Sequence, residues 1–233
     1  MEKTKKYLLT TRPLAKAVVE EAATKNIVIE ELSFIETNAV VDPLLTEKIQ
    51  GLSTKKLTVV FTSMNAVEAV ANQIKVAVDW RIYCMGNTTK KLIQEKLPSA
   101  QITGTADNAE SLAQEILDDE IENAVFFCGN IRRDELPQKL RSKGVKIEEV
   151  IVYETTEIQN LLTRQYEGVL FFSPSAVHSF FKLNKLPQQT RLFAIGKTTK
   201  ETIRKYADNK IIIAQTADKN ELAKQAVAYV AKA

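Results

Sequence analysis

The stretch Phe61-Thr-Ser-Met-Asn-Ala-Val67 returns as Phe171-Phe-Ser-Pro-Ser-Ala-Val177, at an offset of 110 residues. Three further pairs recur in the same order: Gly86–Lys90 with Gly196–Lys200, Thr105–Asp107 with Thr216–Asp218, and Ile29–Thr37 with Ile147–Thr155. Four ordered matches indicate an internal duplication, and a period this long is typical of two related domains rather than of a solenoid. We therefore interpret the chain as two units of roughly 110 residues each.

Each half of the chain alternates short apolar runs with segments of helical period. The predicted extended segments are Tyr7–Thr10, Ile27–Ile35, Leu57–Phe61, Arg81–Met85, Gln101–Thr103, Ala124–Cys128, Val169–Phe172, Arg191–Ile195 and Lys210–Ala214. The predicted helices of the first half are Leu14–Thr24, Asn65–Ile74, Thr88–Leu97 and Ala109–Leu117. Continuous apolar strands that alternate with helices indicate an α/β fold with parallel sheets covered on both faces.

Composition excludes several classes of protein. The 233 residues include 32 lysines and arginines against 29 acidic residues, a net charge of +3, which does not favour a general nucleic-acid binder. The longest stretch without Asp, Glu, Lys or Arg, Gly168 to Phe181, is too short to span a bilayer, and the first residues do not resemble a signal peptide. Two cysteines, Cys84 and Cys128, and a single histidine argue against a Cys/His metal site. We expect a cytoplasmic protein that binds neither membranes nor nucleic acid.

The repeats are strongest in the segments that follow predicted strands. Ligands of parallel sheets bind beyond the carboxyl ends of the strands, in these loops. The loops are Thr10–Pro13, Thr62–Asn65, Gly86–Thr89, Cys128–Arg132, Ser173–Ser175 and Gly196–Thr199. Their hydroxyls, arginines and backbone N–H groups at helix starts are suited to binding anions, although serine, threonine and asparagine also serve simply as helix caps. None of the loops is a GxGxxG or Walker sequence, so no nucleotide site is indicated.

The residues Phe171–Val177, Ala194–Thr199 and Val152–Thr155, with Thr11–Pro13 and Phe61–Val67, resemble the uroporphyrinogen-III synthase family. The resemblance covers nearly the whole chain. It implies two flavodoxin-like α/β domains joined by two extended crossover strands, with residues 1–36 and 156–233 in one discontinuous domain and residues 38–153 in an inserted domain. The residues by themselves are equally compatible with a plain break near Glu120.

The resemblance also implies a reaction. Family members cyclise hydroxymethylbilane, a linear tetrapyrrole polycarboxylate, with inversion of ring D and loss of water in haem biosynthesis. The implied enzyme is a cofactor-free lyase that acts on this small-molecule substrate. The oligomeric state is open, with a monomer as the default expectation, and the Cys and His content predicts no metal. Tyr153 matches the family's tyrosine in the second crossover, where it could act as a weak general acid. The alternative is a strand tyrosine that packs at a hinge, and Ile35 takes its place in the first crossover.

Substrate-binding candidates lie in the strand-end loops. Those carried over from the family are Arg12, Ser63, Thr88, Ser173, Ser175, Lys197, Thr198 and Thr199. Arg132 and Arg133 are added because they follow the first strand of the second repeat, as Arg12 follows that of the first. Each arginine could instead be a solvated surface charge. We expect His178 to be a partly exposed helix residue and both cysteines to be buried apolar side chains.

Two other functions can be compared with the sequence pattern. Duplicated α/β lobes would also suit a non-enzymatic protein that binds an anionic metabolite, since a fold does not fix a function. A glycosyl- or phosphotransferase would require a carboxylate pair or a nucleotide loop, and the strand-end loops contain neither.

Overall fold

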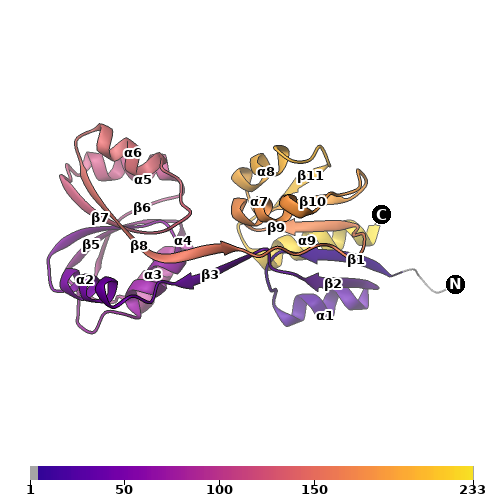
Figure 1. Cartoon of the computed structure of the whole chain (residues 1–233), viewed down its shortest axis with the longest axis horizontal. Helices are drawn as coiled ribbons and strands as arrows, with labels where there is room; N and C mark the ends of the chain where they lie inside the picture. The colour runs from indigo at the N-terminus through magenta and orange to yellow at the C-terminus, as the bar shows by residue number, and fades with distance from the viewer. Residues whose placement is uncertain (1–4, 233) are drawn as a thin grey trace. The chain divides into compact units, whose positions relative to one another are not determined.

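A computed structural model describes residues 5–232 of the chain. The chain divides into two compact units, of which unit 1 consists of Met1–Glu36 with Thr156–Ala233, and unit 2 of Thr37–Thr155 (Figure 1). Both units are built on predominantly parallel β-sheets flanked by helices, so the predicted α/β class is confirmed.

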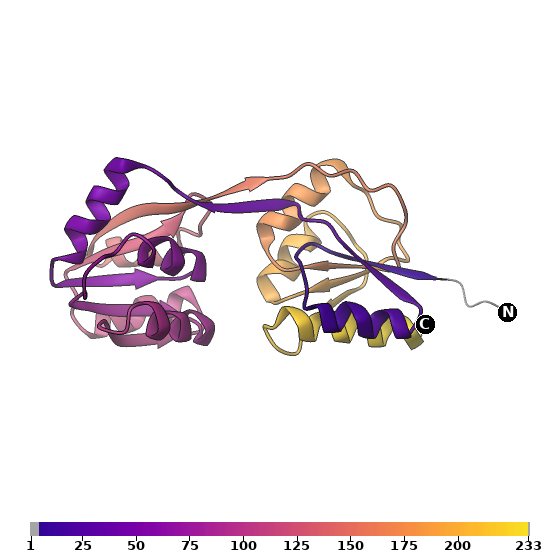
Figure 2. The same ribbon diagram turned by 90° about the horizontal axis from the view of Figure 1, so that it is seen from below.

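Unit 1 contains a five-stranded sheet in the order β11-β10-β9-β1-β2, with all neighbours parallel. Its strands are β1 (Lys6–Thr10), β2 (Ile27–Glu31), β9 (Gly168–Phe171), β10 (Arg191–Ala194) and β11 (Ile211–Ile213). Its helices are α1 (Lys16–Thr24), α7 (Pro174–Leu183), α8 (Lys197–Arg204) and α9 (Lys219–Lys232). Helices α1 and α9 lie side by side on one face of the sheet (Figure 2), and the buried cluster around Leu8 includes residues of both. Leu9 points to the other face, where α7 and α8 pack, because successive strand side chains alternate.

Unit 2 contains a six-stranded sheet in the order β3-β8-β7-β4-β5-β6. Its strands are β3 (Ile35–Ala39), β4 (Leu57–Phe61), β5 (Trp80–Met85), β6 (Gln101–Ala106), β7 (Asn123–Gly129) and β8 (Lys146–Glu157). Its helices are α2 (Pro43–Ser53), α3 (Met64–Ala71), α4 (Asn87–Lys96), α5 (Ala109–Asp118) and α6 (Glu135–Ser142). One buried cluster joins the sheet to α2, α3 and α4, and a second joins its other face to α5 and α6.

Strands β3 and β8 carry the chain between the units. The backbone N–H of Val40 donates to the carbonyl of Val152 at 3.0 Å, and the N–H of Ile158 donates to the carbonyl of Phe34 at 2.9 Å. From the first bond to the second the residue number decreases on one segment and increases on the other, so the two crossover segments run antiparallel.

The two sheets share one spatial order. The series β2-β1-β9-β10-β11 of unit 1 corresponds to β8-β7-β4-β5-β6 of unit 2. In chain order, however, β1 and β2 come first in unit 1, whereas β7 and β8 come last in unit 2. Each unit therefore combines the first two strands of one sequence repeat with the last three strands of the other. The two repeats have exchanged halves, so the repeat boundary near Glu120 differs from the boundaries of the compact units.

The predicted strands are present with small shifts in their ends, except in one region. The extended segment predicted for Ile27–Ile35 is divided between β2 and the start of β3. Helix α2 was not predicted. It begins with Asp42, whose carboxylate accepts from the N–H of Leu44 at 2.8 Å, and with Pro43 in the first turn, which is a common helix start.

Candidate active site

The loops at the carboxyl ends of β1, β9 and β10 lie beside one another, because these three strands are neighbours in the sheet of unit 1. The first loop is tied to β9 by the hydroxyl of Thr11, which donates to the carbonyl of Leu170 at 2.9 Å. Arg12 follows, and its side chain is exposed. Among residues 5–232, no hydrogen bond or ion pair engages the guanidinium of Arg12, so its charge is free to meet an anion.

Helix starts supply the remaining groups of this edge. The hydroxyl of Ser173 accepts from the N–H of Ala176 at 3.2 Å and lies 3.1 Å from the hydroxyl of Ser175. Ser173 therefore caps α7, and its role toward a substrate stays a prediction. Helix α8 starts at Gly196 with no side-chain cap, which leaves its first N–H groups available.

The residues Lys197, Thr198 and Thr199 differ in exposure although they are consecutive. Lys197 is exposed and Thr198 is half-buried. Thr199 is only 3% exposed, as is its repeat counterpart Thr89 at 4%. Thr199 therefore packs inward and has little surface to offer a substrate.

Unit 2 repeats this arrangement at the ends of β4 and β5. The hydroxyl of Ser63 accepts from the N–H of Asn65 at 3.2 Å and so caps α3. Helix α4 starts at Gly86 without a side-chain cap, and Thr88 is exposed in its first turn.

The loop after β7 carries Arg132 and Arg133. Strand β7 takes the same place in its sheet as β1, so both arginines lie in the region equivalent to Arg12. Arg132 forms an ion pair with the largely buried carboxylate of Glu149 and lies 3.7 Å from that of Asp134. Arg133 is 52% exposed, with its only partner among the described residues, Glu135, at 3.9 Å. Arg132 is thus partly neutralised, unlike Arg12.

Tyr153 lies on β8, in register with Gly129 at the end of β7. Its ring covers Gly129 and joins the buried cluster of unit 2, and the residue is 9% exposed. Within residues 5–232 the phenol makes no hydrogen bond, so it has no fixed acceptor in the protein. A phenol O–H can donate a hydrogen bond to a ligand.

The two cysteines are buried, and the single histidine is hydrogen-bonded to a neighbouring tyrosine. Burial raises the pKa of the Cys128 thiol to about 11 and also raises that of Cys84, so both thiols are neutral near pH 7. His178 lies in α7, with its Nδ1 at 2.6 Å from the hydroxyl of Tyr206.

No group of three or more His, Cys, Asp or Glu residues in the described part of the chain could hold a metal ion. No helix within residues 5–232 is long and apolar enough to cross a membrane.

Gly129 and Asn130 lie in the predicted loop Cys128–Arg132 but were not singled out as site residues. Gly129 allows the Tyr153 ring to approach, and the Asn130 side chain bonds to the backbone of β8. The signal was a Gly-Asn pair directly after an apolar strand, but the bonding partner is 25 residues away in sequence.

These features define a two-unit α/β protein whose strand-end loops are suited to an anionic ligand. The family model described as "Uroporphyrinogen-III synthase HemD" matches residues 16–224. The chain therefore belongs to the uroporphyrinogen-III synthase family, whose members are cyclising lyases of haem biosynthesis.

Individual relatives agree with this membership. The uroporphyrinogen-III synthase of Saccharomyces cerevisiae is 28% identical in an alignment of length 188 that covers 65% of this chain and 66% of that protein, slightly under two thirds of its length. The uroporphyrinogen-III synthetase of Helicobacter pylori has a TM-score of 0.67 at 15% identity, covering 97% of this chain and 100% of that one. A mutant uroporphyrinogen III synthase of Thermus thermophilus has a TM-score of 0.74 at 12% identity, covering 97% and 99%. The two solved structures show the same fold.

Proposed function

We propose that this chain catalyses the cofactor-free cyclisation of hydroxymethylbilane to uroporphyrinogen III. Loss of the terminal hydroxyl leaves an azafulvene on ring A. The substituted carbon of ring D attacks it to give a spiro intermediate, which fragments and closes again with ring D inverted. The hydroxyl leaves with a proton as water, so the reaction is overall a dehydration. Family membership supports this proposal.

The two units supply different groups for this reaction. The substrate carries eight carboxylates, and the exposed, unpaired guanidinium of Arg12 is the strongest anion-binding group among the candidates. We expect Lys197 and the uncapped N–H groups at Gly196 and Gly86 to bind further carboxylates. Ser175 and Thr198 on strand-end loops of unit 1, with Thr88 and Arg133 on those of unit 2, are half-buried or exposed and complete the proposed binding set.

Tyr153 is the proposed general acid. The observation that carries this role is a phenol opposite the carboxyl end of β7 with no acceptor among the described residues. It would donate its proton to the departing hydroxyl and recover a proton when the macrocycle closes. Positioned acids of this kind contribute about 10²–10⁴-fold to a rate. The remaining catalysis is geometric, because the same substrate closes without an enzyme to the uninverted isomer.

Chromatography of the product isomers tests this function. The chain is incubated with enzymatically generated hydroxymethylbilane, and the products are oxidised and separated, with heat-denatured chain as the control. We expect type III porphyrin from the native chain and type I from the control. Type I alone from the native chain would favour a non-enzymatic binding protein. The monomeric state and the cytoplasmic location stay predictions from the sequence.

A further inference from the structure

Asn130 connects the end of β7 to the strand that carries Tyr153. Its Oδ1 accepts from the N–H of Thr155 at 2.8 Å and from that of Ile131 at 2.8 Å. Its Nδ2 donates to the carbonyl of Thr155 at 3.3 Å, and its own backbone N–H donates to the carbonyl of Tyr153 at 3.2 Å. The bond to Ile131 is local to the loop, whereas the other bonds tie Asn130 to β8.

The register between β7 and β8 shifts at the same point. Cys128 lies opposite Ile151, but Gly129 lies opposite Tyr153, so β8 contains one extra residue at this bulge. Bulges re-aim side chains and are frequent near active sites. Here the shift places the tyrosine ring directly over a residue that has no side chain.

Gly129 is required for that placement. A Cβ added to Gly129 would lie 2.5 Å from Cε2 and Cζ of Tyr153 and 2.9 Å from its hydroxyl oxygen. These separations are well below ordinary carbon contacts of about 3.5–4.0 Å. Any larger residue at position 129 would therefore displace the ring.

The fixed segment extends one strand further. The hydroxyl of Thr155 lies 3.3 Å from that of Thr37 on β3. Asn130 is thus bonded to Thr155, whose side chain contacts the other crossover strand. The phenol itself has no hydrogen bond to any described residue, so its position depends on the ring packing and on the backbone that Asn130 holds.

We propose that Asn130 and Gly129 are positioning residues that place the Tyr153 hydroxyl for proton donation. Gly129 sets the closest approach of the ring, and Asn130 fixes the β8 backbone on both sides of Glu154. This inference rests on the proposed catalytic role of Tyr153. It predicts that changes at Asn130 or Gly129 act on turnover through the hydroxyl and not through general loss of structure.

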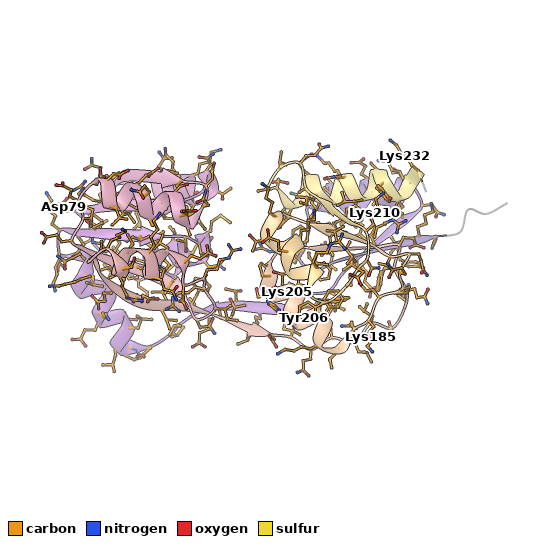
Figure 3. All side chains as sticks on the ribbon, turned by 90° about the horizontal axis from the view of Figure 1, so that it is seen from above. Asp79, Lys185, Lys205, Tyr206, Lys210 and Lys232 are labelled. Atoms are coloured by element: carbon orange, nitrogen blue, oxygen red, sulfur yellow. The ribbon has the colours of Figure 1, made fainter. Side chains whose placement is uncertain are left out.

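The test compares three variants with a matched control. Asn130→Ala removes all three side-chain bonds, whereas Asn130→Asp keeps the acceptor for Thr155 and Ile131. Gly129→Ala displaces the ring and leaves Asn130 intact. The control is Asn184→Ala in unit 1. Asn184 also makes three side-chain bonds to backbone atoms, but at the carboxyl end of α7, opposite the end that Ser173 caps. The next residue in the chain, Lys185, is labelled in Figure 3.

The readout is kcat and KM, measured alone and in the Tyr153→Phe background. We expect Asn130→Ala and Gly129→Ala to lower kcat about ten- to a hundredfold, in keeping with small displacements of a catalytic group. Asn130→Asp should retain most activity, and Asn184→Ala should lower the unfolding midpoint with little effect on kcat. In the Tyr153→Phe background, each of the two harmful changes should cost less than about threefold, because the hydroxyl is already absent.

Three results would overturn the inference. The first is an equal loss from Asn130→Ala in both backgrounds, while Tyr153→Phe alone is impaired. The second is an equal kcat loss from Asn184→Ala. The third is full activity of Tyr153→Phe, which also removes the proposed acid. Absence of type III product from the unmutated chain would instead reject the proposed function itself. If Asn130→Ala does not fold, the same cycle is run with Gly129→Ala.

Discussion

Units 1 and 2 have the same strand order but offer different chemistry at their strand ends. After the equivalent strands β1 and β7, Arg12 is unpaired among the described residues, whereas Arg132 is held by Glu149. In the equivalent crossovers, unit 2 has Tyr153 on β8 where β3 has Ile35. A duplicated backbone has thus kept the positions of its loops while the side chains diverged. We infer that unit 1 mainly binds anionic groups and that unit 2 supplies the acid.

The largest effect on turnover is expected at Tyr153 and Ile35, which occupy equivalent places in the two crossover strands. Tyr153→Phe keeps the ring over Gly129 but removes the hydroxyl, so kcat should fall by about 10²–10⁴-fold. Ile35→Val, which removes one methyl group at the equivalent, only half-buried place, should leave kcat within about twofold and cost at most about 0.5 kcal/mol of stability. Quenched-flow kinetics and thermal unfolding check both. A silent Tyr153→Phe would leave this tyrosine only its place in the buried cluster of unit 2.

The two arginine positions are expected to show the next largest difference. A charge-assisted hydrogen bond contributes about 1.5–3 kcal/mol, so Arg12→Ala should weaken product binding about tenfold to a hundredfold. Arg132→Ala should weaken it less, because Glu149 already neutralises that charge. Anaerobic calorimetric titration with product measures both. Higher salt should weaken wild-type binding, since exposed charges are screened within about 10 Å at 0.1 M. A larger loss at Arg132 would reverse the assignment of the two units.

A smaller effect is expected at the paired glycines before α4 and α8. Gly86 has φ +82°, a conformation that side chains disfavour, whereas Gly196 has φ −170°, which any residue adopts. A Cβ at either position would meet nothing within 4 Å, so the pair isolates the backbone effect. Gly86→Ala should cost about 1–3 kcal/mol of unfolding free energy, and Gly196→Ala less than about 0.5 kcal/mol. Equal costs in urea unfolding would contradict the strain at Gly86.

The smallest effect concerns alkaline stability, because both cysteines belong to unit 2. Burial raises the pKa of the Cys128 thiol to about 11 from an ordinary value of 9.0. Below about pH 9 the thiol is protonated in both folded and unfolded chains; between about pH 9 and 11 the unfolded chain loses this proton first, so stability falls as pH rises. Hydrogen exchange should show unit 2 losing protection before unit 1 over this range, and Cys128→Ala should reduce the difference. Equal loss in both units would argue against the thiol as the cause.

Local sequence patterns were sufficient to predict the parallel strands and the loops that follow them. Short apolar runs rich in β-branched residues, such as Leu57–Phe61, favour buried parallel strands. The repeat then identified the loops at Gly86 and Gly196. The exchange of halves between the repeats was implied only by the family resemblance. The repeat pattern could not predict it, because the same tandem sequence repeat is expected whether or not the halves are exchanged in the fold. Helix α2 was missed although Asp42 and Pro43 are a recognisable helix start.

The details of the site were harder to predict, because they depend on partners distant in sequence. Nothing around Arg132 indicates that Glu149, on the neighbouring strand, takes up its charge. The bonds from Asn130 to Thr155 and the register shift at Gly129 likewise exist only after β7 and β8 pair. The serines at 63 and 173 were predicted as substrate groups, and their hydroxyls cap helices.

The central claim is that the fold imposes the geometry of ring closure while the Tyr153 hydroxyl accelerates it. The most direct measurement is the isomer composition of the product formed by Tyr153→Phe as its concentration is raised against a fixed amount of hydroxymethylbilane. Spontaneous closure gives type I and competes with the slowed enzyme, so the account predicts that the type III fraction rises with enzyme concentration and approaches that of the wild type. A product that stays type I at all concentrations, although the variant is folded and binds product, would contradict it, as would a type III fraction equal to that of the wild type at every concentration.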